Sequence, residues 1–533
     1  MRKVLVAAAL AACSASALGA EERAPPTQVF FLADPQIHNV YGAALKQMFP
    51  VSNWVSGVAI RPPEVNLLAP LTLRYALQQG QARLPANNPL VVVLGDGTNI
   101  ACSGEADTFD AEFKRAPREI IRLMAHGNHD SYLMGTVNSY IPTDAAVRKP
   151  VSMETASLPV DESFWQPSDA PKVQGTSMRD RNWLDGCYRP SVAGSDPGTP
   201  MNKVRWLARY AEDLKLHGLE QTSNGNTSDG GLAFSGVGQP GTTLGRMNYR
   251  FDGVWYRPQP GGRDEAMDYM RTWKSFIVQA VDLDERHTLI LIDTSVCEKA
   301  EGGPAYISTN AGQIGCIGES QFITIHSLIQ GISRSRSLIV AGHFPLHSLK
   351  KEGSKLSALL EAARPEGWTY VSGHTHNAMT DTTFGNGRDR NIGSTTDWPM
   401  ESHILTFHPD TAQIIGTQSI VLGAPPRVMK YKKGLQWPGT YSELCRHLEV
   451  AKALAKADPH QSDARWTSPS TSRRKCRKVQ DDWAESAREL IRLQELVSKR
   501  FDEEPGYRDF MLSVAAGASL HEHNSFSLGN YIH

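Results

Sequence analysis

Short runs of apolar residues alternate with segments of helical spacing along the first 130 residues of the chain. The runs are too short and too uniform for helices, so they predict buried strands, at 27–33, 90–94 and 120–125. Between them, apolar residues at helical spacing predict a helix over 63–79 that ends at Gly80, and a second helix at about 106–115. This alternation predicts an α/β layer.

The same pattern returns in the second half of the chain. Further apolar runs predict strands at 275–281, 287–292, 337–341, 368–371, 404–407 and 412–420. Helices are predicted at 321–331 and 356–363. The chain therefore contains two stretches with an α/β pattern, and a segment of different character lies between them.

Residues from about 140 to 265 form that intervening segment. They are rich in Gly, Pro, Asn, Ser and Asp, which favours loops, and 223–231 consists almost entirely of turn formers. One helix is predicted there, Lys203–Leu216. We interpret the segment as a large loop-rich insertion in the α/β domain.

After about Gly423 the pattern becomes helical. Periodic segments at 442–455 and 483–500 predict a C-terminal helical extension. The basic run 473–478 lies between them and predicts a solvated loop tied down by a disulfide. A length of 533 residues exceeds the ~250–300 that one core usually covers. We therefore expect a domain over 21–423 and an extension over 424–533.

The N-terminus has the pattern of an export signal. Arg2 and Lys3 precede the apolar residues 4–12, and small residues follow, which predicts a signal peptide over residues 1–20. The sequence around Cys13 also resembles a bacterial lipobox, so a lipid anchor is the alternative to plain secretion. A membrane-spanning helix needs ~20 apolar residues, and no stretch is that long. We expect an exported protein, periplasmic or secreted, without a transmembrane segment.

Charge and cysteine content refine this picture. Lys and Arg total 55 against 56 Asp and Glu, so no overall field favours nucleic acid, and we expect no nucleic-acid binding. Apart from Cys13 there are six cysteines, an even number that indicates disulfides in an exported chain. Their spacing suggests three pairs among the fifteen possible pairings, namely Cys297–Cys316, Cys445–Cys476 and, by elimination, Cys102–Cys187.

Polar residues follow five of the predicted strands. They are Asp34, Asp96, Asn128 with His129, His343, and His374 with His376. Because the carboxyl ends of strands in such sheets meet at one edge, we expect these side chains to converge. Two carboxylates, one amide and three imidazoles form a mixed oxygen and nitrogen set that suits Mn, Fe or Zn.

The number of these groups exceeds the three protein ligands of a catalytic zinc. It suits two divalent or trivalent metal ions that share a bridging carboxylate and a hydroxide, and that clamp a phosphoryl group. The sequence therefore predicts a dinuclear centre and a small phosphorylated substrate.

Five segments resemble, in order, the motifs of the calcineurin-like metallophosphoesterase family. They are Asp34-Pro-Gln36, Gly95-Asp96, Gly127-Asn128-His129-Asp130, Gly342-His343 and Gly373-His374-Thr-His376. The resemblance covers about residues 27–420 and implies a four-layer α/β/β/α sandwich with a dimetal centre. It also implies hydrolysis of phosphate mono- or diesters by attack of a metal-bridging hydroxide.

The resemblance assigns a role to each residue. Asp34 and His376 would hold the first metal, Asp96 would bridge, and the second metal would take Asn128, His343 and His374. His129 would stabilise or protonate the leaving oxygen, and Asp130 would tune the basicity of His129.

One position departs from the family pattern. The first motif is usually Asp-x-His, whereas Gln36 stands third here. We expect Gln36 to be a metal ligand or to contact the ligands, and His38 is the alternative. We interpret His126 as structural and His347 as exposed, and expect residues 391–398 to line the pocket. The competing hypothesis for the whole protein is a non-catalytic cell-envelope protein that binds metal or a partner.

Overall fold

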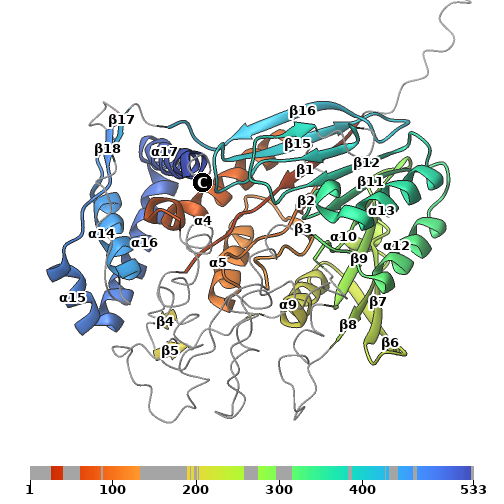
Figure 1. The fold of residues 1–533 in the computed structure, drawn as a ribbon, viewed down its shortest axis with the longest axis horizontal. Coiled ribbons are helices and arrows are strands. Elements are labelled where there is room, and N and C mark those ends of the chain that lie inside the picture. Colours follow the sequence, from red (N-terminus) through yellow and green to blue (C-terminus); the bar gives the residue numbers. More distant parts are fainter. Residues whose placement is uncertain are drawn as a thin grey trace, which may run out of the picture.

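The protein is a mixed α/β structure built on two β-sheets with helices outside them (Figure 1). The structure, a computed structural model, describes residues 26–39, 61–85, 88–131, 189–191, 194–196, 201, 203–256, 274–295, 315–381, 387–425, 428–430, 442–459 and 465–529. The predicted signal peptide, Cys13 and most of the segment from 140 to 200 lie outside these residues.

The first sheet has five strands in the order β16-β15-β1-β2-β3. Its members are β1 (Thr27–Leu32), β2 (Leu90–Val93), β3 (Ile121–Met124), β15 (Glu401–Phe407) and β16 (Ile414–Val421). Strands β1, β2 and β3 run parallel, and β15 is antiparallel to β1. The three strands predicted near the N-terminus are therefore adjacent, and their carboxyl ends lie at one edge of the sheet.

The second sheet has nine strands in the order β13-β14-β12-β11-β10-β9-β8-β7-β6. Its members are β6 (Leu219–Asn226), β7 (Leu232–Gly238), β8 (Arg250–Trp255), β9 (Phe276–Asp282), β10 (His287–Leu291), β11 (Ser337–Gly342), β12 (Trp368–Ser372), β13 (Thr380–Asp381) and β14 (Asp389–Asn391). Strands β10, β11, β12 and β14 form a parallel set, so the ends of β11 and β12 also share an edge. Two short separate pairs complete the strands, β4 (Arg189–Ser191) with β5 (Gly194–Asp196) and β17 (Val428–Lys430) with β18 (Arg465–Thr467).

The side chains of β10 show how the core is divided. Leu289 and Leu291 belong to the large apolar cluster that includes the five-stranded sheet. Ile290 and Ile292 belong to a second cluster with residues of α12 (Glu319–Gly331) and α13 (Lys350–Ala363). Since successive side chains of a strand point to opposite faces, one face of the nine-stranded sheet packs toward the other sheet and the opposite face packs on helices.

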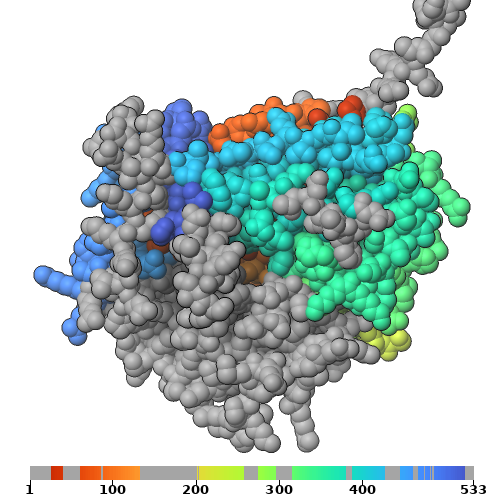
Figure 2. Space-filling model, turned by 45° about the horizontal axis from the view of Figure 1, so that its top comes forward, coloured from red at the N-terminus to blue at the C-terminus, as the bar shows by residue number. Residues whose placement is uncertain are grey.

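Helices also cover the five-stranded sheet. Helix α4 (Pro63–Arg83) contacts β15 and β16, and Phe30 of β1 packs against Gly80 of this helix. Helix α5 (Ser103–Lys114) contacts α4, and its Phe109 ring lies 5.0 Å from the Arg122 guanidinium of β3. The C-terminal segment adds α14 (Ser442–Lys456), α15 (Arg473–Asp481), α16 (Trp483–Glu503) and α17 (Pro505–Gly529). Figure 2 shows this C-terminal segment, in blue, at the opposite side of the molecule from the green helices of the nine-stranded sheet.

Polar contacts join the two sheets along β3 and β9. Tyr210 of α9 (Lys203–Lys215) accepts a hydrogen bond from the Met124 N–H of β3 at 3.0 Å and donates one to Gln279 Oε1 of β9 at 2.6 Å. The Gln279 amide donates in turn to the Met124 carbonyl at 2.8 Å. These buried groups satisfy one another, which fixes how the edge strand β3 of the first sheet lies against β9 in the interior of the second.

Helix α4 does not end at Gly80, as the sequence predicts, but continues to Arg83. A Cβ atom at Gly80 would lie 2.2 Å from the Phe30 ring. The glycine therefore permits the close approach of helix and strand, and it does not terminate the helix.

The prediction of a loop-rich segment is wrong for its second half. Residues 203–255 form α9, the short helix α10 (Thr243–Arg246) and the strands β6, β7 and β8, which extend the nine-stranded sheet. The turn formers in 223–231 lie partly in β6 and partly in the hairpin turn, where Thr227 and Gly231 exchange hydrogen bonds. Most of β6 is exposed, so its sequence carries no apolar pattern that would have identified a strand.

The C-terminal extension is more helical than predicted. The basic run 473–478 belongs to α15, which begins after Ser472, whose side chain caps the Lys475 N–H. The predicted Cys445–Cys476 disulfide is present and ties α15 to α14. Cys102 and Cys316 are also disulfide-bonded, but their predicted partners, Cys187 and Cys297, lie outside the described residues.

The sequence does not predict helix α17 (Pro505–Gly529), because the apolar residues of this segment do not gather on one face of a helix. None of the helices in the described part of the chain has the length and continuous apolar character that a membrane crossing needs.

Candidate metal centre

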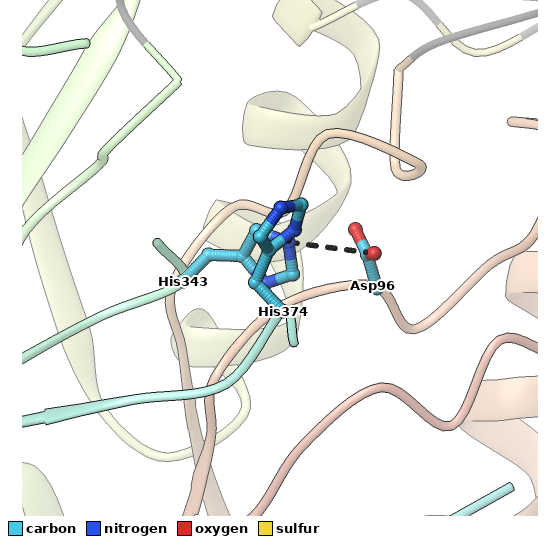
Figure 3. A group of neighbouring side chains, drawn as sticks. All are labelled: Asp96, His343 and His374. Atoms are coloured by element: carbon cyan, nitrogen blue, oxygen red, sulfur yellow. Dashed lines mark hydrogen bonds and ion pairs between the residues drawn. The ribbon is translucent and has the colours of Figure 1, made fainter. Parts of the chain in front are cut away.

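The residues that follow the parallel strands converge where the two sheets meet. Two sets of ligand atoms each lie within 4.8 Å of one another, Asp96 with His343 and His374, and Asp34 with Asp96 and His376. Figure 3 shows the two imidazole rings of the first set turned toward the Asp96 carboxylate. Asp96 belongs to both sets, as expected of a bridging ligand.

The backbone around these residues is unusual. Five of the predicted site residues have positive φ angles although none is glycine, namely Asp34 (50°), Gln36 (40°), Asp96 (54°), His374 (74°) and His376 (56°). Such conformations cost free energy for residues with a side chain, and they persist where the surrounding structure holds them. Their concentration here marks the strand ends as a site that is stabilised by the rest of the fold.

His343 has a fixed orientation. Its Nδ1 donates to the Leu94 carbonyl at 2.8 Å, which leaves the lone pair on Nε2 directed into the site. His343 Nε2 lies 2.8 Å from Asn128 Oδ1, 3.4 Å from Asp96 Oδ2 and 3.1 Å from His374 Nδ1. Groups that carry lone pairs thus face one another, an arrangement that a cation would stabilise.

Asp34 also presents an atom that suits a cation. Its Oδ2 accepts a hydrogen bond from the His374 N–H at 3.0 Å. Its Oδ1 is buried and has no hydrogen-bond partner among the described residues, and it lies 3.4 Å from His376 Nε2. The Asp34 oxygen and the His376 nitrogen pair with each other here, and both are atoms that could bind a cation instead.

Asp96 and His376 have strongly perturbed pKa values. Burial raises the pKa of Asp96, but the imidazoles of His343, His129 and His374 outweigh it and lower the value to about 2. Burial lowers the pKa of His376, but Asp34 and Asp397 outweigh it and raise the value to about 10. Both shifts reflect an excess of opposite charge packed into one site.

Asp397 contacts the ring nitrogen of His376 that faces away from Asp34. Asp397 Oδ2 lies 2.5 Å from His376 Nδ1, and both carboxylate oxygens accept from the guanidinium of Arg61 at 2.8 Å. A carboxylate on the outer nitrogen orients a ligating imidazole and increases its basicity. Asp397 lies in the segment 391–398 that the sequence predicts to line the pocket.

The same segment holds the loop that carries Asp34. Ser394 Oγ donates to the Asp34 carbonyl at 3.0 Å, and Thr396 Oγ1 donates to the Pro35 carbonyl at 2.5 Å. The loop that follows the first strand is thus braced by residues close to the other end of the domain.

Gln36 is oriented differently from a metal ligand. Its Oε1 accepts a hydrogen bond from Arg61, while its Nε2 donates to Asp96 Oδ2 at 3.0 Å and lies 3.3 Å from His376 Nε2. An amide nitrogen of this kind is a donor and offers no lone pair to a metal. Gln36 therefore contacts the ligands but does not present a ligand atom, which is the second of the two roles predicted for it.

The predicted alternative, His38, lies away from the cluster. His38 Nδ1 is 3.0 Å from Glu105 Oε1 at the start of α5, and His38 belongs to neither set of ligands in the described part of the chain. His126 lies between Ser131 and Ser295, 2.7 Å from each hydroxyl, as suits a structural residue. His347 is half-exposed, as predicted.

Asp130 does not act on the His129 ring, contrary to the prediction. Asp130 Oδ2 accepts from the Asp96 N–H at 3.0 Å and from the Gly127 N–H at 2.9 Å, and its Oδ1 accepts from the Thr98 N–H at 3.1 Å. The carboxylate is thus committed to main-chain donors and holds the loops after β2 and β3 together. A Cβ at Gly127 would lie 2.1 Å from Asp96 Oδ1, so this junction requires glycine.

His129 is instead oriented by Asn99. Its Nδ1 donates to the Asn99 carbonyl at 2.6 Å, and its main-chain N–H donates to Asp96 Oδ1 at 2.8 Å. Burial lowers the pKa of His129, partly offset by Asp96. The contact with Asn99 fixes the tautomer, so the lone pair of the neutral ring lies on Nε2.

Arg61 and Asn99 are the site residues that sequence reasoning missed. Arg61 stands just before α4, after only three apolar residues at 58–60, which are too few to predict a strand, and Asn99 lies in an irregular loop. They meet in the fold, where Arg61 donates to Asn99 Oδ1 at 2.9 Å.

The donor set could hold metal ions, since it includes two groups of ligand atoms that have one carboxylate in common. A scan of the chain against protein-family models finds no match, and a search of curated proteins finds no similar protein. The family resemblance therefore rests on the sequence motifs alone.

Proposed function

We propose that the protein is an exported metal-dependent phosphoesterase of the calcineurin-like metallophosphoesterase family, which hydrolyses phosphate mono- or diesters. The observation that carries the proposal is the pair of ligand groups that share Asp96. The arrangement of two sheets with helices outside them is compatible with the four-layer α/β/β/α sandwich of that family.

The site residues divide between two positions. Asp34, Asp96 and His376 would hold one ion, and Asp96, Asn128, His343 and His374 would hold the other. Two such ions, when bound, activate a water molecule and neutralise negative charge on the phosphoryl oxygens.

His129 supplies the proton chemistry of the chain itself. Because its Nδ1 proton is held by Asn99, the ring exchanges protons through Nε2. A phosphate ester bound beside this buried ring would bring negative charge that favours the imidazolium, which can then stabilise or protonate the leaving oxygen. Asp130 contributes by holding together the two loops that carry Asp96 and His129, because its carboxylate accepts main-chain hydrogen bonds from both loops.

The direct test measures metal content and hydrolysis on the same preparation. We expect two equivalents of Mn²⁺, Fe or Zn²⁺ per chain, and hydrolysis of an aryl phosphate, its bis-aryl diester, or both. A folded, metal-loaded protein that hydrolyses neither compound would contradict the proposal. The ratio of the two rates would distinguish a monoesterase from a diesterase.

The orientation of Gln36 favours a second candidate, a non-catalytic cell-envelope protein that binds metal or a partner. Because Gln36 presents no ligand atom, one metal position has fewer protein ligands than the other. A protein that retains one ion at most, even with metal in excess, and that lacks hydrolytic activity would support this candidate.

A further inference from the structure

Gln36 and Arg61 make the two halves of the candidate centre unequal. Among the described residues, one metal position has four side chains. They are His343, through its Nε2, and three side chains with an atom within 3.4 Å of that nitrogen, Asp96, Asn128 and His374. The other position has the side chains of Asp34, Asp96 and His376. Gln36 is adjacent to this second position, yet its amide nitrogen faces it.

The amide orientation of Gln36 follows from the chemistry of its neighbour. A guanidinium carries donors and no acceptor, so the Gln36 atom that meets Arg61 must be the oxygen. The nitrogen is then directed at Asp96 and His376, 3.0 Å and 3.3 Å away. Arg61 therefore keeps the only potential ligand atom of Gln36 turned away from the metal position.

Arg61 is itself held firmly. Its Nε and one terminal nitrogen each donate to Asp397 at 2.8 Å, and the other terminal nitrogen donates to Asn99 at 2.9 Å. Its carbonyl accepts from Asn66 of α4 at 3.2 Å, and the Arg61 side chain is only 3 % exposed. The planar guanidinium group is hydrogen-bonded on several sides, so it cannot rotate without breaking several charged hydrogen bonds.

We propose that the centre loads its metals in two steps of different affinity, and that the position formed by Asp34, Asp96 and His376 is the weaker one because Arg61 withholds the Gln36 oxygen from it. This inference rests on the proposed dinuclear centre. Fewer ligands reduce affinity directly, and the Gln36 N–H that faces the position is a donor, which a cation does not attract. The weaker ion would exchange with its surroundings, so metal supply would regulate the fully loaded state.

The test is a calorimetric titration of the metal-free full chain with Mn²⁺, together with electron paramagnetic resonance to count free Mn²⁺. We expect one tight equivalent and a second that binds at least about tenfold more weakly, a difference of about 1.4 kcal/mol. The variant His376→Ala should lose the weak step and keep the tight one.

Gln36→His tests the cause. An imidazole in place of the amide adds a ligand, so the second equivalent should tighten by about tenfold or more. Gln28→His is the matched control, since it adds the same residue to strand β1, where Gln28 contacts Thr406, and it should leave both steps unchanged. Arg61→Met provides an independent variant, because loss of the guanidinium releases the Gln36 oxygen and should also tighten the second step.

The outcomes separate this inference from the proposed function. Two equivalents of equal affinity in the unmodified protein would overturn the inference and leave the phosphoesterase proposal standing. Unchanged binding of the second equivalent in both folded variants, Gln36→His and Arg61→Met, would overturn the assigned cause. A folded chain that binds none of Mn²⁺, Fe and Zn²⁺ would overturn both proposals.

Discussion

The two sheets contribute different chemistry to the candidate centre. The strands of the five-stranded sheet end in the oxygen donors, Asp34 after β1, Asp96 after β2 and Asn128 after β3. The strands of the nine-stranded sheet end in imidazoles, His343 after β11, and His374 and His376 after β12. A metal ion held by both kinds of ligand would therefore join the two sheets.

The two sets of ligands are also held in different ways. The loops of the five-stranded sheet are tied to one another, because Asp130 accepts from main-chain donors after both β2 and β3. The imidazoles are held across the gap between sheets, since His343 donates to the Leu94 carbonyl and the His374 N–H donates to Asp34. The oxygen side is thus organised within its own sheet, whereas the nitrogen side depends on the sheets being docked.

The largest effect is expected at Asp96, which serves both metal positions. Asp96→Asn keeps an oxygen that can accept the His129 N–H but removes the charge that bridges two ions. We expect loss of most bound metal and a fall in turnover of about 10⁴-fold or more, since the ions supply several kcal/mol of transition-state stabilisation. Metal analysis and aryl phosphate hydrolysis measure both.

Asp107→Asn is the matched control for this substitution. Asp107 lies exposed on α5, paired with Arg209, and its change should leave metal content and turnover unaffected. Full metal content in Asp96→Asn would refute the bridging role of Asp96.

A smaller loss is expected from the nitrogen side. His374→Ala removes a ligand from one position only, so we expect one of the two metal equivalents to be lost and turnover to fall by about 10³-fold. The oxygen-bearing loops should keep their structure, because Asp130 holds them independently. His347→Ala is the control, a half-exposed histidine outside the ligand groups. Loss of both ions from His374→Ala would show that the imidazoles also organise the oxygen side.

His129→Ala should affect rate without affecting metal content. The His129 main-chain N–H, which contacts Asp96, remains in the variant, while the ring that exchanges protons is removed. We expect turnover to fall by about 10²–10⁴-fold with both ions retained. If the variant loses metal, His129 belongs to the group of residues that hold the ions.

The smallest effect concerns the docking of the sheets far from the centre. His287, at the start of β10, donates from Nδ1 to Asp284 at 2.9 Å and from Nε2 to the His408 carbonyl, which follows β15, at 2.8 Å. Burial lowers the pKa of His287, but Asp284 outweighs it and the pKa is raised. Burial raises the pKa of Asp284, but His287 and Thr27 outweigh it and the pKa is lowered.

The raised pKa of His287 gives stability that is present below its unfolded value of about 6.5 and is lost as the pH rises through the folded value. The lowered pKa of Asp284 gives stability that is present above about 3.9 and is lost as the pH falls through its folded value. We therefore expect His287→Gln to cost about 2 kcal/mol between pH 4 and 6.5, and less at pH 9. Urea unfolding at the two pH values measures this, and an equal cost at both would exclude the ion pair as the cause.

The convergence of the candidate ligands was predictable because each follows an apolar run that ends abruptly in a polar residue. Asp34, Asp96 and His343 illustrate this, and the structure brings them together. Arg61 and Asn99 could not be found in this way, since their contacts join segments without a regular pattern. Asp130 was identified as a site residue but assigned the wrong partner, because the neighbour in sequence, His129, is not the neighbour of its carboxylate oxygens in space.

The fold was predictable where strands are buried and not where they are exposed. The strands β2 and β11 are uniformly buried, and β1 is buried from Val29 onward, so all three form apolar runs in the sequence. Strand β6 is mostly exposed and rich in turn formers, and only its pairing with β7 makes it a strand. Tertiary contact overrides local preference at such positions.

The placement of β1 between β2 and β15 determines when the site can form during synthesis. Asp34 and its partner His374 are 340 positions apart in the chain. At ~5–20 residues per second, a ribosome needs about 20–70 s to make the intervening segment. Until His343 is made, the nascent chain carries Asp34, Asp96 and Asn128 without the imidazoles of His343, His374 and His376, and folds with many contacts of such long range form slowly. The centre is therefore among the last parts of the molecule to mature.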